Sequence, residues 1–329
     1  MKKRLLGKTG FDISEISTGT WQIGGKWGTT FNHANADAIL NASIDNGINF
    51  IDTADVYSDG ESEKAIGNFI RTCKERVYVA TKCGRQFSPH IDALYQPKAL
   101  RQFVEDSLKR LGLETLDLIQ LHCPPTETYN RPEIFDLFND LKKEGKILNL
   151  GVSVEKIEEA SKAIEYDNVT TVQIIFNMLR QRPSAHFFAE AASKNVGIIV
   201  RVPLASGLLT GKFSAATTFG KDDHRNFNRN GEAFDKGETF SGVDYTKGLA
   251  AVEAIKAVFP QATNLSAIAL KWILMFSEVS CVIPGASNPE QINSNISASA
   301  IADLSVEDMA KVKAIYNQII WPDLSKEKW

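Results

Sequence analysis

The sequence predicts an α/β protein folded as a parallel (β/α)8 barrel, the TIM-barrel fold. Short apolar segments recur eight times along the 329 residues, and nearly all of them precede an amphipathic helical pattern. These segments are continuous apolar runs rather than alternating ones, as expected for strands with both faces buried. No linker rich in Pro, Gly or Ser divides the chain, so we interpret residues 1–329 as a single domain.

The predicted elements follow one another in a regular order. Residues 3–16 alternate and turn at Lys8-Thr9-Gly10, which indicates a small β-hairpin before the first strand of the barrel. The predicted strands cover residues 16–21, 49–53, 77–82, 116–122, 147–153, 171–176, 197–203 and 280–285. Helical patterns cover residues 35–46, 97–111, 133–143, 155–165 and 183–193. Another helix starts with a capping pattern at Ser62, and a last one starts at Val306.

The main irregularity is the long segment between the seventh and eighth predicted strands. Residues 214–245 are polar and rich in Gly and Asn. A loop of this length is unusual in a compact domain unless it is functional, so we expect a lid or a binding loop.

Composition excludes several classes of partner. A net charge of −3 at pH 7 gives no reason to expect a nucleic acid or an anionic membrane as partner. The N-terminal residues lack the apolar run of a signal peptide, and no run is long enough to span a membrane. The four cysteines are scattered, which is typical of reduced thiols. We therefore expect a cytoplasmic protein, and the oligomeric state stays open.

Four polar residues lie at or just after the C-terminal ends of three consecutive predicted strands. Asp52 closes the second strand, and Tyr57 lies in the loop after it. Lys82 closes the third strand and His122 the fourth. In this fold, ligands bind where the carboxyl ends of the strands meet. A tyrosine with a pKa of ~10 is a poor acid, but a neighbouring lysine lowers that pKa, and a carboxylate keeps the lysine charged. A histidine can orient a substrate carbonyl, so the set fits proton delivery to that oxygen while a hydride reaches the carbon.

Other interpretations of these residues were weighed. Singly, Asp52 could cap a helix, Tyr57 could be a loop aromatic, and Lys82 and His122 could be ordinary polar groups. The five histidines show neither HxH nor HExxH spacing, so we expect no metal site. Residues 207–212 are one residue too short for a phosphate-binding Walker loop and lack its final Ser or Thr, and no GxGxxG follows a strand.

Several longer segments carry a family resemblance. They read LGKTGFDISEISTGTW, FIDTADVY, VATKCG, LDLIQLHCP, GKILNLGVS, TVQIIFN, PLASGLLTGKF and VIPGASNPEQINSN. With these segments, in this order, the chain resembles the bacterial aldo-keto reductases, including the branches near the channel β subunits and the sugar and aldehyde reductases. The resemblance implies a hairpin-capped barrel with a nicotinamide cofactor across its top. It also implies a catalytic tetrad of Asp52, Tyr57, Lys82 and His122, with Tyr57 as general acid/base.

The resemblance also implies where the cofactor lies. The expected cofactor is NADPH or NADP, with NADH or NAD as the alternative. The residues implied near the nicotinamide are Thr20, Trp21, Asp52, Ser153, Gln173 and Arg201. Those implied around the pyrophosphate are Pro203, Leu204, Gly207, Leu209, Gly211 and Lys212. Those implied at the adenosine end are Gly285, Ser287, Asn288, Gln291 and Asn295.

The sequence departs from the family pattern at two places. Many members have an aromatic residue that stacks on the nicotinamide at the position of Arg201. The planar guanidinium of Arg201 could stack in the same way, or it could pair with a carboxylate. At the adenosine end, the positions that commonly hold a 2′-phosphate contain no Lys or Arg, although Lys212, Arg225 or Arg229 could reach it. We therefore expect use of both cofactors, with a modest preference for NADPH.

The substrate is less clear from the sequence. Trp21, Trp27, Tyr57 and His122 are the candidates to line its pocket. Phe87 and Trp329 are weaker candidates, since ordinary packing explains them equally well. Polar residues 224–229 suit a hydroxylated substrate such as a sugar or hydroxyaldehyde. We expect an NAD(P)(H)-dependent oxidoreductase that interconverts a small carbonyl compound and its alcohol. The alternative is a cofactor-binding regulatory subunit with little turnover.

Overall fold

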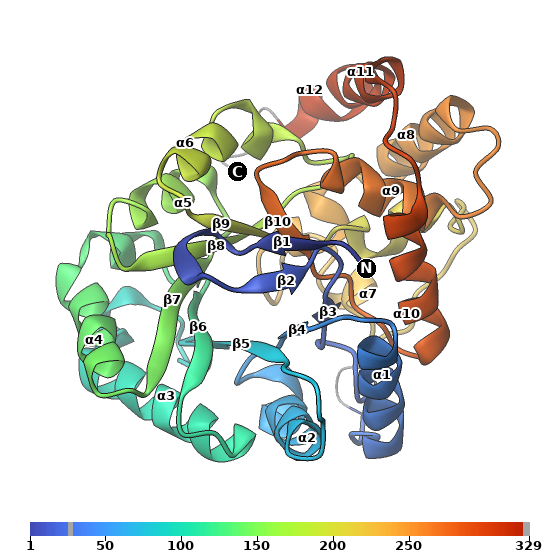
Figure 1. Ribbon diagram of the computed structural model, residues 1–329. Coiled ribbons are helices and arrows are strands. Elements are labelled where there is room, and N and C mark those ends of the chain that lie inside the picture. Colours follow the sequence, from blue (N-terminus) through green and yellow to red (C-terminus); the bar gives the residue numbers. More distant parts are fainter. Residues whose placement is uncertain (26–28, 325–329) are drawn as a thin grey trace.

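The structure is a computed structural model that describes residues 1–25 and 29–324, and it shows a parallel barrel inside a layer of helices (Figure 1). Its strands follow chain order: β3 (Thr18–Gly19), β4 (Phe50–Asp52), β5 (Tyr78–Cys83), β6 (Leu116–His122), β7 (Ile147–Ser153), β8 (Val169–Ile175), β9 (Gly197–Arg201) and β10 (Val279–Val282). The barrel closes through parallel bridges from Ile16 to Val282 and from Gly19 to Gly285. A Cβ at Gly19 would lie 2.7 Å from the Ile283 carbonyl oxygen, so this closure requires a glycine.

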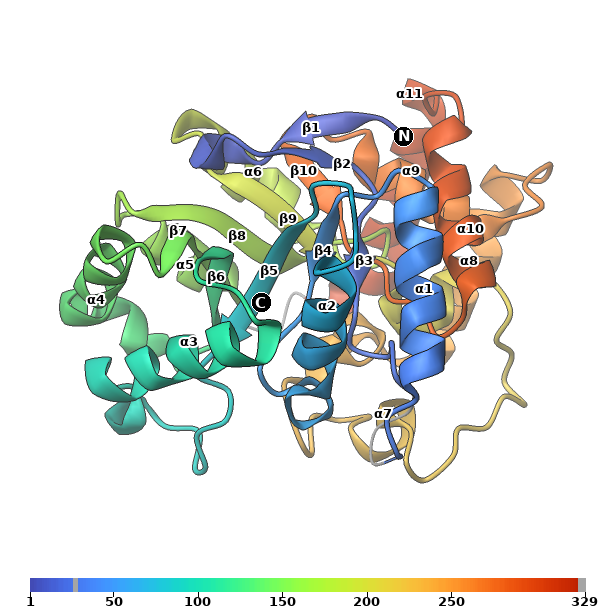
Figure 2. The same cartoon turned by 60° about the horizontal axis from the view of Figure 1, so that its bottom comes forward.

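The helices cover the outer face of the barrel, as Figure 2 shows for α1, α2 and α3. The helices are α1 (His33–Asp45), α2 (Glu61–Ile70), α3 (Pro97–Leu111), α4 (Pro132–Lys143), α5 (Ile157–Ala163), α6 (Phe187–Ser193), α7 (His224–Phe227), α8 (Tyr245–Val258), α9 (Leu265–Leu274), α10 (Pro289–Ile296), α11 (Val306–Ile315) and α12 (Trp321–Leu324). Among the described residues, no helix is both long and apolar enough to cross a membrane.

The predicted barrel is confirmed, and β6, β7 and α3 have the predicted bounds. Helices α1 and α4 differ from prediction by one or two residues at their ends, and two other helices differ more. Helix α5 starts at Ile157 rather than at 155, because the backbone N–H groups of Glu155 and Lys156 donate to Glu159 Oε2 ahead of the first turn. The predicted helix 183–193 is divided into a 3-10 turn, η5 (Arg182–Ala185), and helix α6.

The prediction that Ser62 caps a helix was wrong. Helix α2 starts at Glu61, and Gly60 occupies the N-cap with φ 85°. The Ser62 hydroxyl lies 2.9 Å from Thr53 Oγ1 and donates to Thr20 Oγ1, also at 2.9 Å. It therefore ties α2 to the ends of β3 and β4 instead of capping its own helix.

The predicted N-terminal hairpin forms and lies across the base of the barrel (Figure 1). Strands β1 (Lys3–Leu5) and β2 (Asp12–Ser14) are antiparallel, with a short 3-10 turn, η1 (Gly7–Thr9), between them. Leu6, Phe11 and Ile13 are buried in a cluster with the inward-facing Phe50 and Leu118 of the barrel strands. These apolar contacts seal the floor of the barrel, so only its C-terminal end remains for chemistry.

Arg4 fixes the hairpin to the last part of the barrel. Its guanidinium donates to the carbonyl oxygens of Leu274 at 2.6 Å and Val279 at 2.9 Å, and it pairs with Glu15 at 3.1 Å. The end of α9 and the start of β10 are thereby held against the first residues of the chain.

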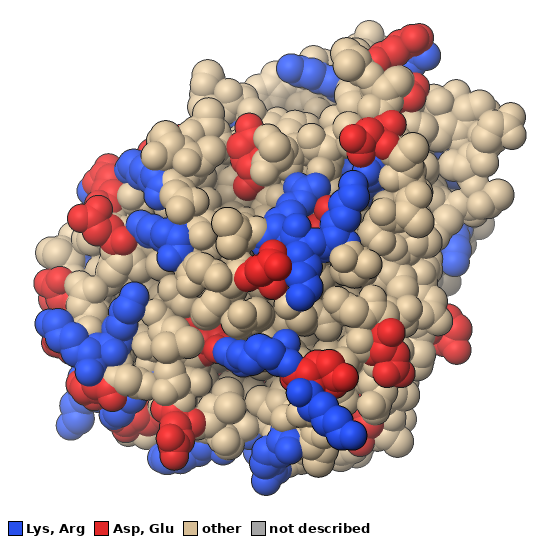
Figure 3. Space-filling model, in the orientation of Figure 1, with Lys and Arg blue, Asp and Glu red and all other residues tan. Residues whose placement is uncertain are grey.

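The hairpin side of the molecule carries charges of both signs. In Figure 3, basic side chains gather over the middle of this face, and acidic side chains lie among and around them. This mixture agrees with the small net charge of −3.

Candidate active site

The four residues that the sequence singled out lie together at the C-terminal end of the barrel. Lys82, fully buried on β5, places its Nζ atom 2.5 Å from Asp52 Oδ1 and 3.2 Å from the phenol oxygen of Tyr57. The Tyr57 and His122 rings meet nearly edge to face, with centroids 6.1 Å apart. Parallel pairing of β4, β5 and β6 brings these side chains to one edge.

Asp52 is held by two amides as well as by Lys82. Gln120 and Gln173 donate to Asp52 Oδ2 at 3.1 and 2.8 Å, while Lys82 also donates to the Thr53 carbonyl oxygen at 2.8 Å. A buried ion pair persists only when its remaining hydrogen-bonding groups are satisfied. Sequence reasoning missed Gln120, although an amide two residues before His122 in an apolar strand was a signal.

The pKa of Tyr57 reflects two opposing effects. Burial raises the pKa of this half-buried phenol above 10.0, while Lys82 lowers it, as the sequence predicted, by a smaller amount. Tyr57 therefore carries its proton at neutral pH, and the Lys82 ammonium is placed to stabilise a phenolate at this position.

His122 is neutral at physiological pH. Burial lowers its pKa well below 6.5, and the positive charges of Arg85, Lys82 and Arg201 lower it further. Its Nδ1 atom is buried and has no hydrogen-bond partner among the described residues. A neutral imidazole can donate one N–H to a carbonyl oxygen without competing with Tyr57 for a proton.

A model of the Aldo/keto reductase family matches residues 15–317 of this chain, a span that includes all four of these residues. The chain belongs to the aldo/keto reductase family. This family is a class of NAD(P)H-dependent oxidoreductases, and its barrel fold is the one described above.

Individual relatives cover nearly the whole chain. The uncharacterized oxidoreductase YqkF of Bacillus subtilis (strain 168) is 28% identical over 324 residues, with 98% of each chain covered. The NADH-specific methylglyoxal reductase of Escherichia coli (strain K12) is 28% identical, with 91% of this chain and 93% of the relative covered. Among solved structures, the glycerol dehydrogenase AKR11B4 from Gluconobacter oxydans is similar with a TM-score of 0.78. It is 29% identical, and 97% and 96% of the two chains are covered.

In this aldo/keto reductase, the residues expected near a nicotinamide lie beside the tetrad. Ser153 and Gln173 face each other across β7 and β8, and both are almost fully buried. The Thr20 hydroxyl donates to the Asp52 carbonyl oxygen at 3.0 Å, which gives Thr20 a structural role in this arrangement. The amide of Gln173 is likewise engaged by Asp52, so a cofactor amide contacting it would join an existing network.

The predicted aromatic lining is only partly placed. Trp21 packs edge to face against His224 of the long loop, with ring centroids 4.7 Å apart. Phe87 stacks among Tyr95 and Phe103 and therefore serves ordinary packing. Trp27 and Trp329 lie outside the described residues.

Arg201 pairs with a carboxylate, which was one of the two alternatives for this position. Its Nη1 atom lies 3.5 Å from Glu238 Oε1, and its Nη2 atom donates to the Val154 carbonyl oxygen at 2.9 Å. The Glu238 charge offsets the guanidinium charge near the site. Sequence reasoning missed Glu238, because nothing local marks a loop acid that meets β9.

The segment after β9 suits a phosphate group. Val202, Ala205 and Ser206 have positive φ values of 51°, 48° and 53°, and Gly207 follows at 97°. A β-branched residue rarely adopts such a conformation, and strain of this kind concentrates at functional sites. Successive turned amides form concavities that bind anions. Lys212 is exposed at the end of this segment, whereas Leu209 is buried and Pro203 and Leu204 lie before the turn.

The residues expected at the adenosine end belong to helix α10 and to the residues just before it. Asn288 accepts the Gln291 N–H at 3.0 Å, and the Ser287 N–H donates to Gln291 Oε1 at 2.8 Å. Gly285 and Ser287 are exposed, while Asn295 is nearly buried and its Nδ2 atom has no hydrogen-bond partner among the described residues. The donors at this end fit a polar nucleotide group.

The two loop arginines considered for the 2′-phosphate are engaged elsewhere. Arg225 makes two hydrogen bonds to the Asp223 carboxylate, at 2.8 and 2.5 Å. Arg229 lies over the rings of Phe240 and Tyr245. Both stabilise the fold of the long loop itself.

One group of side chains has the spacing of a metal site. Ligand atoms of Cys123, Glu155 and Glu238 lie within 4.8 Å of one another. However, Arg201 lies 3.6 Å from Cys123 Sγ and Arg85 lies 3.0 Å from Glu238, so two cations already occupy this cluster. Burial also raises the pKa of Cys123 to about 11, which keeps the thiol protonated. We assign no metal here.

Asp55 is a buried acid that sequence reasoning overlooked. It is fully buried, and neither carboxyl oxygen has a hydrogen-bond partner among the described residues. Burial, and then the nearby charge of Glu63, raise its pKa to about 7. Its backbone N–H donates to the Lys82 carbonyl oxygen at 3.3 Å, so the main chain of Asp55 is bonded to that of the tetrad lysine.

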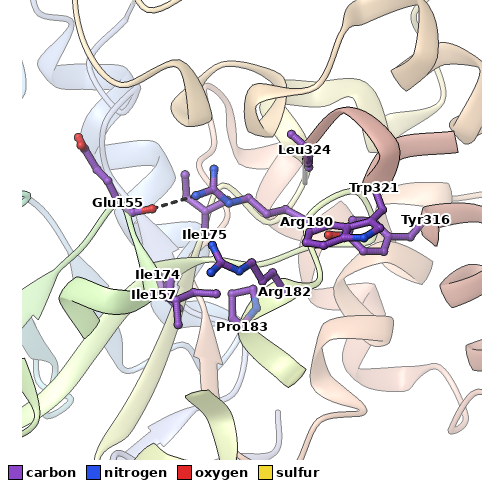
Figure 4. Close-up of a pocket in the computed structure, with 10 residues that line it drawn as sticks. All are labelled: Glu155, Ile157, Ile174, Ile175, Arg180, Arg182, Pro183, Tyr316, Trp321 and Leu324. Carbon is purple, nitrogen blue, oxygen red and sulfur yellow. Dashed lines mark hydrogen bonds between the residues drawn. The ribbon is translucent and has the colours of Figure 1, made fainter. Parts of the chain in front are cut away.

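A separate narrow pocket lies where β8 ends and the C-terminal helices pack (Figure 4). Figure 4 shows Arg180 reaching between Glu155 and the rings of Tyr316 and Trp321, and its Nη2 donates to the Glu155 carbonyl oxygen at 2.9 Å. None of the four tetrad residues lines it.

Proposed function

We propose that this chain interconverts an aldehyde or ketone and the corresponding alcohol with NAD(P)(H), and that Tyr57 is its general acid/base. A sugar or hydroxyaldehyde is the proposed substrate class. The observation that supports this proposal is the position of Lys82, whose ammonium bonds both Asp52 and the Tyr57 phenol. We also propose that residues 1–329 form one domain and act in the cytoplasm.

The proposed mechanism assigns one task to each side chain. The cofactor, when bound, supplies or accepts the hydride at the substrate carbon. Tyr57 donates its proton to the carbonyl oxygen, and the reverse transfer makes it the base for alcohol oxidation. Lys82 stabilises the phenolate that remains, while Asp52 keeps the ammonium in place. The neutral His122 donates a hydrogen bond that orients the carbonyl oxygen.

The residues present fit a dinucleotide. Ser153 and Gln173 would hold the carboxamide, the turned backbone from Pro203 to Gly211 with Lys212 would hold the pyrophosphate, and Ser287, Asn288 and Asn295 would hold the adenosine end. The charge of Lys212 and the unpartnered amide of Asn295 support this arrangement.

The experiment is a screen of cofactor consumption. Purified protein is mixed with NADPH or NADH and a panel of aldoses, glyceraldehyde, methylglyoxal and aromatic aldehydes. We expect saturable turnover with several of them. If no carbonyl compound or alcohol is turned over while the cofactor still binds, the protein works as a cofactor-binding regulatory subunit and the proposal is wrong.

A further inference from the structure

Two arginines of the barrel converge on one carboxylate of the long loop. Arg85, just after β5, places Nη1 3.0 Å from Glu238 Oε1, and Arg201 at the end of β9 lies 3.5 Å from the same oxygen. Glu238 ends the short turn η7 (Lys236–Glu238) in the loop. We name Arg85, Arg201 and Glu238 the arginine–glutamate cluster.

The cluster lies against the reacting residues. Arg201 also contacts Cys123, the neighbour of His122, and both arginines act electrostatically on His122. Glu238 acts in the same way on Tyr57. The cluster is therefore a near neighbour of the place between Tyr57 and His122 where a substrate carbonyl group would lie.

Arg201 and Glu238 have unused hydrogen-bonding capacity. Arg201 Nε is buried and has no hydrogen-bond partner among the described residues. Glu238 Oε1 receives both arginines, while no described residue donates to Oε2, and the Glu238 side chain is 23% exposed. Oε2 can therefore accept a hydrogen bond from a bound molecule.

The charges of the cluster decide which molecule fits. Two guanidinium groups would attract a substrate phosphate or carboxylate if they faced an open site. Glu238 already occupies that place, and a carboxylate attached to the same chain competes with a free anion at an effective concentration of the order of mM. A second anion beside it would also meet like-charge repulsion.

We propose that Glu238 is a specificity-determining residue that excludes anionic carbonyl substrates and accepts a hydroxyl group of an uncharged, hydroxylated substrate. This inference rests on the proposed oxidoreductase function. It adds the residue that separates neutral hydroxyaldehydes from their phosphorylated or carboxylated counterparts.

The test compares matched substrates in the wild type and in Glu238→Gln, which keeps the side-chain shape but removes its charge. We expect wild-type kcat/KM to be at least ~10-fold higher for glyceraldehyde than for glyceraldehyde 3-phosphate, a difference of about 1.4 kcal/mol. In Glu238→Gln, the ratio of kcat/KM for glyceraldehyde to kcat/KM for glyceraldehyde 3-phosphate should be at least ~10-fold lower than in the wild type. Glu232→Gln, which removes one charge from an exposed loop acid, should leave the ratio unchanged.

A second measurement needs no turnover. Inorganic phosphate should raise the Tm of Glu238→Gln more than that of the wild type, because a ligand stabilises the folded state that binds it. Adding Arg85→Met to Glu238→Gln should remove this extra rise in Tm. The inference is wrong if Glu238→Gln keeps the wild-type substrate ratio, or if phosphate stabilises both proteins equally. Failure of the wild type to turn over any carbonyl compound or alcohol would instead contradict the proposed function, and the phosphate measurement would still decide the role of Glu238.

Discussion

The Lys82 ammonium nitrogen lies 3.2 Å from the Tyr57 phenol oxygen and donates a hydrogen bond to it. In the resting protein this bond is made to a neutral phenol whose pKa is raised by burial. It becomes a stronger, charge-assisted bond when the phenolate forms. The contact therefore stabilises the product of proton transfer more than its starting state, which is the condition for catalysis.

Removing the phenol hydroxyl should remove the proton donor. Tyr57→Phe is expected to lower kcat by at least ~10²-fold while the cofactor still binds, because general acid catalysis contributes roughly 10²–10⁴. Steady-state kinetics and fluorescence titration of the cofactor measure the two effects. Tyr166→Phe is the matched control, because the Tyr166 hydroxyl donates to the Tyr129 carbonyl oxygen and lies outside the tetrad. Near-normal turnover by Tyr57→Phe would exclude Tyr57 from the mechanism.

Removing the Lys82 charge should change the pH profile as well as the rate. Lys82 lowers the pKa of Tyr57 against the larger effect of burial, so Lys82→Met should move the basic limb of the carbonyl-reduction profile to higher pH. Because this change leaves Asp52 buried without its cation, the double variant Asp52→Asn/Lys82→Met serves as a folded control. A slower reaction with an unchanged basic limb would make Lys82 only a positioning residue.

Asp55 should make the protein less stable as the pH rises. Its folded-state pKa of about 7 exceeds the ordinary 3.8, so the folded state binds an extra proton between these values. Stability is lost progressively across that range and not further above it. Asp55→Asn should therefore exceed the wild type in unfolding free energy by an amount that grows from pH 4 to pH 7 and then stays constant. Urea unfolding at several pH values measures this difference. The exposed Asp59→Asn should show no such trend.

The cofactor preference should be small and easy to change. No Lys or Arg occurs among residues 285–295, and Arg225 and Arg229 are engaged within the long loop. We expect NADPH to bind no more than about tenfold more tightly than NADH, a difference of at most ~1.4 kcal/mol. Ser287→Lys should tighten NADPH with little effect on NADH, while Asn293→Lys, elsewhere on α10, should change neither. A wild-type preference of about a thousandfold would show that another basic residue holds the phosphate.

The long loop should be protected from protease by the cofactor. Residues 207–245 include the turned backbone assigned to the pyrophosphate, and exposed Lys221 offers a site for trypsin. We expect cleavage there in the free protein and much slower cleavage with NADPH. Equal cleavage rates in both states would mean that the loop does not close over the cofactor. A site outside the loop gives the reference rate.

The sequence predicted the barrel and the tetrad because strand ends fix both. Asp52, Lys82 and His122 each close an apolar run, and parallel pairing brings such ends together whatever the loops do. Glu238 could not be found this way, since it meets Arg85 across 153 residues through the conformation of a loop without periodicity. The prediction of a helix cap at Ser62 failed for a different reason. Serine favours helix caps, but the hydroxyl of Ser62 hydrogen-bonds to residues of other elements instead.

Because the barrel closes between β3 and β10, it can close only late in synthesis of the chain on the ribosome. Strand β4 has two neighbours once residue 83 has emerged, but β3 meets its second neighbour only near residues 282–285. At about 5–20 residues per second, the first edge stays unpaired for roughly 10 to 50 seconds of synthesis. During that time a nascent barrel offers an open strand to other chains. The surface most exposed to aggregation during synthesis is therefore the free edge of β3, which is paired in the folded enzyme.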